Sequence, residues 1–130
     1  MAETKAEQPL SPHLQIYRAP INMVMSIVHR LTGASLYAGT LVMAWWLIAL
    51  AGGAESYADF QWFIGSAVGR LVLFAFTWAL IHHMLGGVRH LVWDTGRGFD
   101  LATVDRMSWG TPIGSITLTL AVWAVGYAVR

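Results

Sequence analysis

The chain has 130 residues, of which 56% are hydrophobic and 12% are charged, so its charged fraction is about half that of an ordinary soluble domain. A net charge of +1 argues against nucleic acid as a partner. The absence of cysteine excludes structural disulfides, thiolate metal sites and cysteine-bound iron–sulfur clusters from this chain. The composition is that of a membrane protein whose cofactors, if any, are held by histidine or by noncovalent contacts.

The first segment, residues 1–22, is MAETKAEQPLSPHLQIYRAPIN, which contains three prolines and two acids but no apolar run. A secretory signal needs a basic start followed by an apolar core, so we expect no cleaved signal here. The segment is better interpreted as an arm lying at the membrane surface. A single helical domain is expected to follow over residues 23–130.

Three apolar runs occupy this domain, at residues 26–50, 62–93 and 110–129. Each reaches the roughly 20 residues with which a helix crosses a ~30 Å hydrocarbon layer, and the second is long enough to tilt or protrude. The sequence therefore predicts an all-α membrane protein with three transmembrane helices. Three helices make a thin bundle, and small residues along them allow close helix contacts, so we expect a partner membrane subunit.

The charges near the span ends predict an orientation. Basic residues lie before the first span and in the second loop, whereas the first loop carries only acids: Lys5, Arg18, Arg97 and Arg106 against Glu55 and Asp59. Because lysine and arginine gather on the inner side of membranes, we expect the N-terminus and the second loop to face the cytoplasm or the matrix. Arg70 and Arg130 fall on the other side and weaken this bias slightly.

One face of the second span is polar. The stretch HHMLGGVRHLVWD, residues 82–94, carries four residues at spacings of four, three and four, which line one side of a helix: His83, Gly87, His90 and Asp94. His82 and Arg89 lie about 100° to the side. Counted from Asp94 as the inner end, His83 lies about 16 Å deep at 1.5 Å per residue, which is near the bilayer midplane.

An imidazole at that depth indicates a function, because ionisable groups inside a membrane usually mark a proton path, a ligand or a cofactor. A neutral imidazole nitrogen is a good axial ligand for haem iron, and Gly87 leaves room for a flat macrocycle against the helix. Two other interpretations stay open: a hydrogen bond to a neighbouring helix, and a proton-conducting role. A second axial ligand on this chain would have to be His29, the only histidine of the first span.

The stretch SIVHRLTG in the first span forms a second polar group. Ser26 and Arg30 are four residues apart, so a hydroxyl and a fixed positive charge point the same way. Ser26 could simply start the helix while Arg30 snorkels to lipid phosphates. Alternatively, the pair binds an amphiphilic ligand with an oxygen head, such as a quinone, whose anionic charge on reduction the arginine stabilises. His29 could instead meet an acidic group such as a haem propionate.

These two stretches carry a family resemblance. SIVHRLTG matches Ser-x-x-His-Arg-x-Thr/Ser-Gly, and HMLGGVRHLVWDTG matches His-x-x-x-Gly-x-Arg-His followed by aromatic-Asp-x-Gly. In this order on three spans, they resemble the cytochrome b subunit of succinate dehydrogenase, the larger membrane anchor of respiratory complex II, over nearly the whole chain. The arm PLSPHLQIY also resembles that family, with Gln8 where the family commonly has arginine.

The resemblance implies roles for particular residues. His83 rather than His82 would be one axial ligand of a b-type haem, because the motif begins at the histidine four residues before Gly87; the other ligand would come from a second, smaller anchor subunit. Residues of both motifs would contact the polar groups of the two ligands. The haem propionates would lie near His29, Arg30, Arg89 and His90. The head group of ubiquinone would lie at Ser26 and Arg30.

The resemblance also implies a division of labour in a bacterial or mitochondrial inner membrane. Succinate would be oxidised on a flavoprotein, and electrons would pass through an iron–sulfur subunit to ubiquinone, so this chain would hold neither FAD nor an iron–sulfur cluster and no succinate-oxidising site. Two alternatives stay open: a membrane cytochrome b of another dehydrogenase or a fumarate reductase, and a structural or transport subunit without cofactor. Further histidine pairs would be expected of the former, and the third span has none.

Overall fold

The computed structural model describes His13 and residues 16–129, so most of the expected surface arm lies outside the described residues. Four helices follow one another along the chain: α1 (Ile21–Ala51), α2 (Ala54–Gly65), α3 (Ala67–Asp94) and α4 (Leu101–Ala128). The part of the chain that the structure describes contains no strand, which confirms the all-α fold class. By length and composition, α1, α3 and α4 can each cross a membrane.

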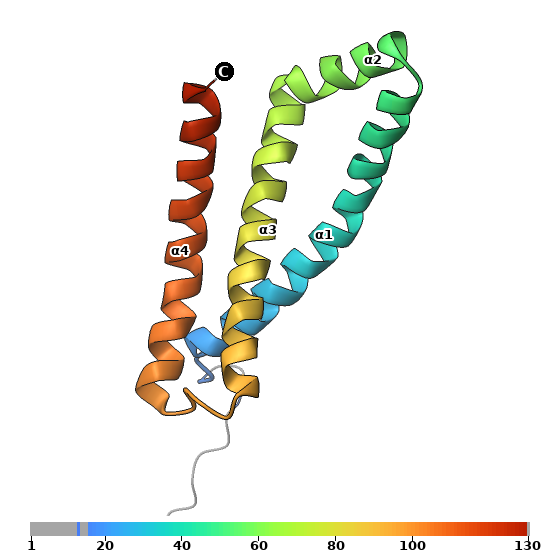
Figure 1. The fold of residues 1–130 in the computed structure, drawn as a ribbon. Helices are drawn as coiled ribbons and strands as arrows, with labels where there is room; N and C mark the ends of the chain where they lie inside the picture. Colours follow the sequence, from blue (N-terminus) through green and yellow to red (C-terminus); the bar gives the residue numbers. More distant parts are fainter. Residues whose placement is uncertain (1–12, 14–15, 130) are drawn as a thin grey trace, which may run out of the picture.

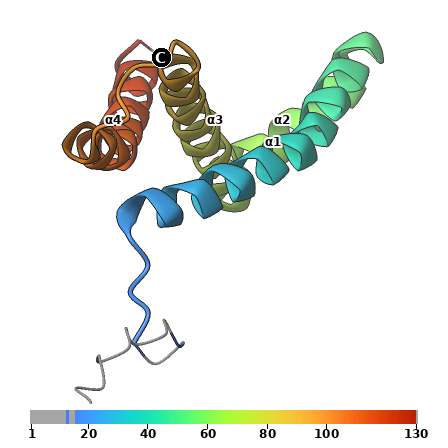
Figure 2. The same ribbon diagram turned by 90° about the horizontal axis from the view of Figure 1, so that it is seen from below.

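The three long helices are arranged as an open bundle. α3 and α4 run alongside each other from the short connection at residues 95–100, which we call the loop end of the bundle (Figure 1). α1 crosses α3 near the loop end and diverges from it toward the opposite end, where α2 connects the two helices (Figures 1 and 2). We call that opposite end the α2 end; it also carries the last turns of α4.

A break at Ser66 divides the stretch of residues 62–93 that the sequence predicts as one span. The backbone of Ser66 is extended, with φ −68° and ψ 164°, and its hydroxyl accepts a hydrogen bond from the Gly69 N–H at 3.0 Å. This side chain caps the first turn of α3. A Cβ at Gly69 would overlap the backbone of Phe63, so glycine allows α2 to fold closely against the start of α3.

The turns at both ends of the bundle use glycine in the left-handed region. Gly53 between α1 and α2 has φ +92°, and Gly96 and Gly98 between α3 and α4 have φ +76° and +78°, a conformation that costs glycine little. α4 then begins after Asp100, whose side chain accepts a hydrogen bond from the Thr103 N–H at 2.9 Å. The hydrogen bonds from Thr103 lower the pKa of Asp100, because they stabilise the charged form of the capping carboxylate.

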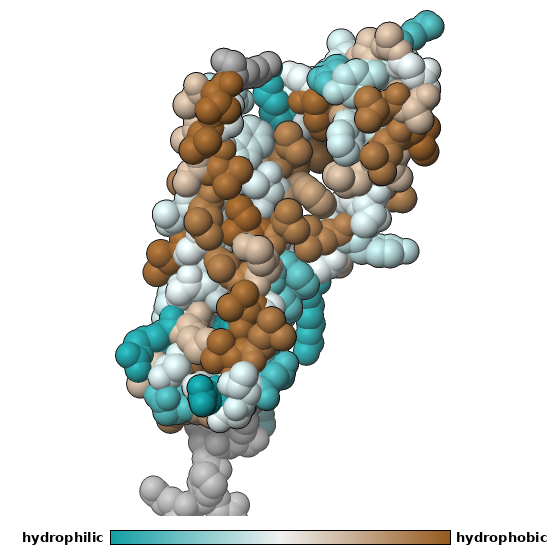
Figure 3. All heavy atoms as spheres, in the orientation of Figure 1, coloured by the Kyte–Doolittle hydropathy of each residue, from teal (hydrophilic) through white to brown (hydrophobic). Residues whose placement is uncertain are grey.

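The packing is inverted relative to a water-soluble protein. Few hydrophobic side chains are buried among the described residues, namely Met25, Ala49, Phe60 and Ala79. Small polar side chains of α4 are buried instead: Ser108, Thr111, Ser115 and Thr119. Apolar side chains cover much of the outer surface of α3 and α4, and hydrophilic residues gather at the loop end (Figure 3). An apolar exterior around a small, polar helix interface suits a bundle surrounded by lipid and by other membrane helices.

Candidate functional site

Three histidines meet near the loop end, where α1 crosses α3. The rings of His29 and His83 are stacked, with centroids 4.0 Å apart and planes inclined by 3°. The His90 ring lies 5.3 Å from that of His29. The structure therefore places His83 and His90 on the side of α3 that meets α1, and it adds His29 from the first helix to this histidine cluster.

The hydrogen bonds of His83 determine its tautomer. Its Nδ1 lies 3.1 Å from the backbone carbonyl oxygen of His29 and 3.3 Å from the hydroxyl oxygen of Thr32. A carbonyl oxygen only accepts, so Nδ1 carries the proton and Nε2 of a neutral ring keeps its lone pair. A backbone hydrogen bond to one imidazole nitrogen commonly fixes the other nitrogen as the metal ligand. In a neutral ring, Nε2 of His83 is thus the nitrogen whose lone pair is available to a ligand.

Thr32 is a contributor that the sequence reasoning missed. Its hydroxyl lies 2.9 Å from the carbonyl oxygens of both Val28 and His29, to which it donates, so its oxygen can accept from His83. The residue is buried and lies within SIVHRLTG, three positions after His29. Its place in that motif was the available signal, although periodicity alone could not show which side chain of α3 it would meet.

Glycines shape the space around the histidine cluster. A Cβ at Gly33 would lie 3.0 Å from Cε1 of His83, and a Cβ at Gly86 would overlap the His29 ring. These two glycines allow α1 and α3 to approach closely. A Cβ at Gly87, by contrast, would meet no atom within 4 Å. The surface of α3 is therefore unobstructed at Gly87, one turn along the helix from His83, as a flat macrocycle lying against α3 would require.

Two other polar residues of the stretch 82–94 face α4. The buried His82 ring has its Nδ1 3.1 Å from the Ser115 hydroxyl oxygen, and the buried Arg89 donates from a terminal nitrogen to Ser108 at 3.4 Å. The guanidinium carbon of Arg89 also lies 5.1 Å from the centre of the Trp93 ring. The structure therefore separates His82 and Arg89 from the side of α3 that carries His83, as the helical spacing predicts.

Two nitrogen atoms near the site lack partners. Nδ1 of His29 and Nε of Arg89 are the buried side-chain polar atoms without a hydrogen bond in the part of the chain that the structure describes. Nε of Arg89 always carries a proton, and buried donors are normally paired because an unpaired one costs free energy. An acidic group such as a haem propionate would accept from it. Nδ1 of His29 lies on the other side of α3, packed against Gly86, so it offers no such contact as the chain stands.

Ser26 and Arg30 remain outside the histidine cluster. They lie one turn apart on α1, Ser26 half-buried and Arg30 exposed. Within residues 16–129, neither side chain forms a hydrogen bond to another residue of this chain. The structure keeps both groups available to a ligand or another subunit.

The histidine cluster differs from a site in which side chains alone hold a metal ion. Within the described ranges, no group of three or more histidine or carboxylate side chains is arranged to hold a bare metal ion. An iron already held by a macrocycle needs only one or two axial ligands from protein. One histidine with a fixed tautomer and an open helix surface one turn away suit a haem better than a free ion.

Comparisons with known proteins all find similarity to the same kind of membrane subunit. A family model described as the transmembrane subunit of succinate dehydrogenase/fumarate reductase matches residues 4–125. The succinate dehydrogenase cytochrome b556 subunit of Paracoccus denitrificans is 37% identical over 116 residues, covering 89% of this chain and 89% of that protein. The cytochrome b556 subunit of Rickettsia felis is 37% identical over 127 residues, covering 95% and 99%. The mitochondrial cytochrome b560 subunit of Bos taurus is 37% identical over 105 residues, covering 79% and 62%.

Proposed function

The chain belongs to the family of succinate dehydrogenase/fumarate reductase transmembrane subunits, and we propose that it is the larger membrane anchor of a succinate:quinone oxidoreductase. In this role it helps to bind haem b and ubiquinone, and it takes part in passing electrons from succinate oxidation to the quinone pool. The relatives are named as succinate dehydrogenase subunits, which favours succinate oxidation over fumarate reduction as the direction.

The observation that carries the haem proposal is the pairing of His83 with the His29 carbonyl at 3.1 Å. It leaves Nε2 of His83 as a lone-pair donor, and the open space at Gly87 lies one turn along the same helix. When bound, haem b supplies a one-electron carrier whose potential depends on its axial ligands and surroundings. We assign His83 as one axial ligand and a histidine of a second, smaller anchor subunit as the other.

Further residues of the chain bind the polar edges of the two ligands. We assign His29, Arg30, Arg89 and His90 to the haem propionates. The unpaired Nε of Arg89 supports the assignment of that residue, because a carboxylate would accept from it. For ubiquinone we assign Ser26, whose hydroxyl donates to a carbonyl oxygen, and Arg30, whose charge stabilises the anionic oxygen that forms on reduction.

The other steps belong to partner subunits. With no cysteine, the chain cannot hold the cysteine-ligated clusters that carry electrons from a flavin. We therefore place FAD and succinate oxidation on a flavoprotein, the clusters on an iron–sulfur subunit, and none of these sites on this chain. Bacterial and mitochondrial relatives support the bacterial inner membrane or the mitochondrial inner membrane as its location.

The experiment that tests the haem site substitutes Gly87 with leucine. The protein itself offers no obstacle, because a Cβ at Gly87 meets no atom within 4 Å, so the fold should persist while the side chain fills the space assigned to the macrocycle. Overfilling a packed site costs about 1–3 kcal/mol, so haem affinity should fall about ten- to hundredfold. The measurement is the haem content of the assembled, purified complex, determined from its visible spectrum.

Gly110→Leu provides the matched control, because Gly110 lies in α4 and a Cβ there also meets no atom within 4 Å. That variant should keep its haem. Equal haem content in the Gly87→Leu complex and the wild-type complex would contradict the proposed position of the macrocycle. Gly87→Ala should give an intermediate content, since one methyl group takes up less of the space.

A topology measurement tests the proposed orientation. With the N-terminus on the cytoplasmic or matrix side and three spans, a reporter fused after Arg130 should lie on the periplasmic or intermembrane side. A second reporter inserted after Gly98, between α3 and α4, should lie on the inner side. Inner-side activity of the Arg130 fusion would contradict either the orientation or the number of spans.

A further inference from the structure

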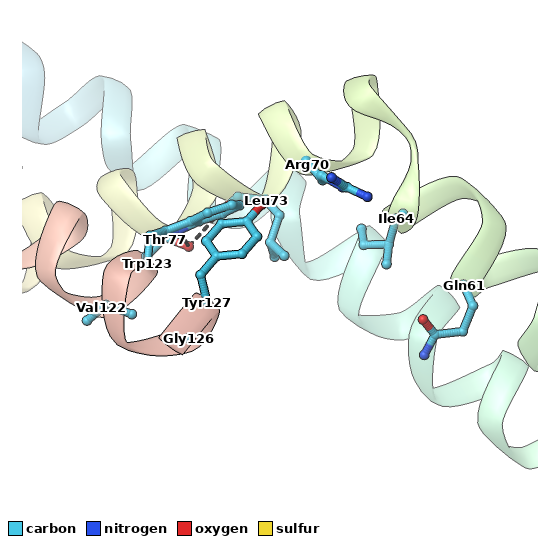
Figure 4. A pocket seen from close by; sticks show the side chains of 10 residues that line it. Gln61, Ile64, Arg70, Leu73, Thr77, Val122, Trp123, Gly126 and Tyr127 are labelled. Atoms are coloured by element: carbon cyan, nitrogen blue, oxygen red, sulfur yellow. Dashed lines mark hydrogen bonds between the residues drawn. The ribbon is translucent and has the colours of Figure 1, made fainter. Parts of the chain in front are cut away.

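A separate cavity opens at the α2 end of the bundle, away from the histidine cluster. Its volume is about 430 Å³, and it lies between the end of α2, the start of α3 and the last turns of α4. Figure 4 shows Trp123 and Tyr127 of α4 on one side, Gln61 and Ile64 of α2 on the other, and Arg70 of α3 reaching over the gap. Residues of three helices thus surround one amphipathic space.

The side of the cavity formed by α4 is ordered by hydrogen bonds and ring contacts. The Trp123 indole N–H donates to the Thr77 hydroxyl at 3.3 Å, and that hydroxyl donates to the Leu73 carbonyl at 2.7 Å. The Trp123 ring also meets those of Phe74 and Tyr127, at 5.3 and 5.9 Å. These rings form an aromatic wall. The lining residues of α3 extend about 10 Å along that helix, from Arg70 to Thr77, at 1.5 Å per residue.

Two glycines leave the cavity open. A Cβ at Gly65, where α2 ends, or at Gly126 in α4 would meet no atom within 4 Å. Both residues line the cavity, so larger side chains at either position would project into free space. The absence of side chains at these two positions therefore contributes to the empty volume, and each position accepts a Cβ without displacing other parts of the chain.

Arg70 places a positive charge at the mouth of the cavity. Its side chain is exposed and, within residues 16–129, it forms no ion pair with a carboxylate. An arginine guanidinium matches phosphate geometry with two parallel hydrogen bonds. Tryptophan and tyrosine characteristically lie at the level of lipid head groups. The cavity combines a phosphate-binding charge with an apolar channel, which are the two parts of a phospholipid.

From this arrangement we propose that the cavity binds a membrane phospholipid. Arg70 holds the phosphodiester of the head group, with Gln61 beside it, and one acyl chain lies along the aromatic wall formed by Trp123. An anionic lipid is favoured over a zwitterionic one, because a basic side chain near the membrane surface attracts net negative charge. The site lies at the α2 end, so it depends neither on the haem nor on the quinone assigned to the loop end.

The test uses the whole complex, purified in detergent, stripped of lipid and titrated with palmitoyl-oleoyl phosphatidylglycerol while native mass spectrometry counts the bound molecules. Arg70→Gln should weaken this binding about fivefold or more, whereas Arg70→Lys should retain most of it. Gly126→Leu should block the cavity and abolish binding there, whereas Gly126→Ala should not. All variants are compared at equal amounts of assembled complex.

A second probe separates phosphate recognition from apolar filling. The matching diacylglycerol has the same acyl chains without the phosphate, and its binding should be weak and unchanged by Arg70→Gln. Phosphatidylglycerol binding that is equal in the wild-type, Arg70→Gln and Gly126→Leu complexes would overturn the proposal. Ubiquinone displacing phosphatidylglycerol from the wild-type cavity, or a cross-link from position 70 to a partner chain, would also overturn it, since either result gives the cavity another occupant.

Discussion

Replacing His83 with alanine should remove the six-coordinate, low-spin spectrum of haem b from the purified complex. The expected cause is the loss of the Nε2 lone pair that the hydrogen bond from Nδ1 to the His29 carbonyl, at 3.1 Å, keeps available. Either the haem is lost or it remains with fewer axial ligands, and both outcomes change the visible and electron paramagnetic resonance spectra. The measurement needs assembled complex and does not depend on activity.

His82→Ala is the matched control, because it removes the same side chain from the neighbouring position. Adjacent helix positions diverge by about 100°, and the His82 ring is buried toward α4 with its Nδ1 3.1 Å from the Ser115 hydroxyl. Losing that hydrogen bond should cost about 0.6 kcal/mol within a membrane, so the low-spin spectrum should persist. An unchanged spectrum in the His83 variant, or a lost one in the His82 variant, would reject the assignment of His83.

The three spans could be predicted because hydrophobic length is a property of the sequence alone. The position of α2 could not, since the apolar character of residues 62–65 continues into α3. The break depends on the extended backbone at Ser66 and on the close approach of Phe63 to Gly69. Neither feature changes the average hydropathy of a window, so a count of apolar residues treats α2 and α3 as a single run.

The helical faces of the site were similarly predictable, whereas the contacts between helices were not. Periodicity places His83 and His90 together and turns His82 away, as the structure has them. It cannot say that Thr32 reaches His83 or that Ser115 reaches His82, because these pairs depend on the register between helices. That register follows from local shape, such as the contact between Gly86 and the His29 ring.

Substituting Arg30 with leucine should slow quinone reduction by the complex by about two to three orders of magnitude. Reduction places negative charge on a quinone oxygen before protons arrive, and a guanidinium in a site shielded from water stabilises that charge strongly. Removing one donor from such a preorganised site costs roughly 3 to 4 kcal/mol. Arg30 is exposed on this chain, so its shielding from water comes from the bound quinone and from the neighbouring subunits.

The second residue of this pair should matter less. Ser26 is half-buried one turn before Arg30, and Ser26→Ala removes a neutral hydrogen bond to a quinone carbonyl, which is weaker than a charged one. Ser35→Ala is its control on the same helix, because the Ser35 hydroxyl is exposed and donates to the Leu31 carbonyl at 2.9 Å. Quinone reduction should decline modestly in the Ser26 variant and remain unchanged in the Ser35 variant.

Measuring the rate with two different electron acceptors distinguishes a quinone-binding role of Ser26 and Arg30 from a structural one. Succinate oxidation with an artificial soluble acceptor should survive Arg30→Leu, because the flavin and the iron–sulfur clusters are assigned to other subunits. Both rates are measured in membranes with equal amounts of assembled complex, and Arg106→Leu serves as the charge control, since Arg106 donates its hydrogen bonds within α4. If the ratio of the quinone rate to the artificial-acceptor rate stayed at its wild-type value in Arg30→Leu and Ser26→Ala, the two residues would have a structural role, in starting the helix and in contacting lipid phosphates. A fall in that ratio confined to these two variants would place the quinone head beside them.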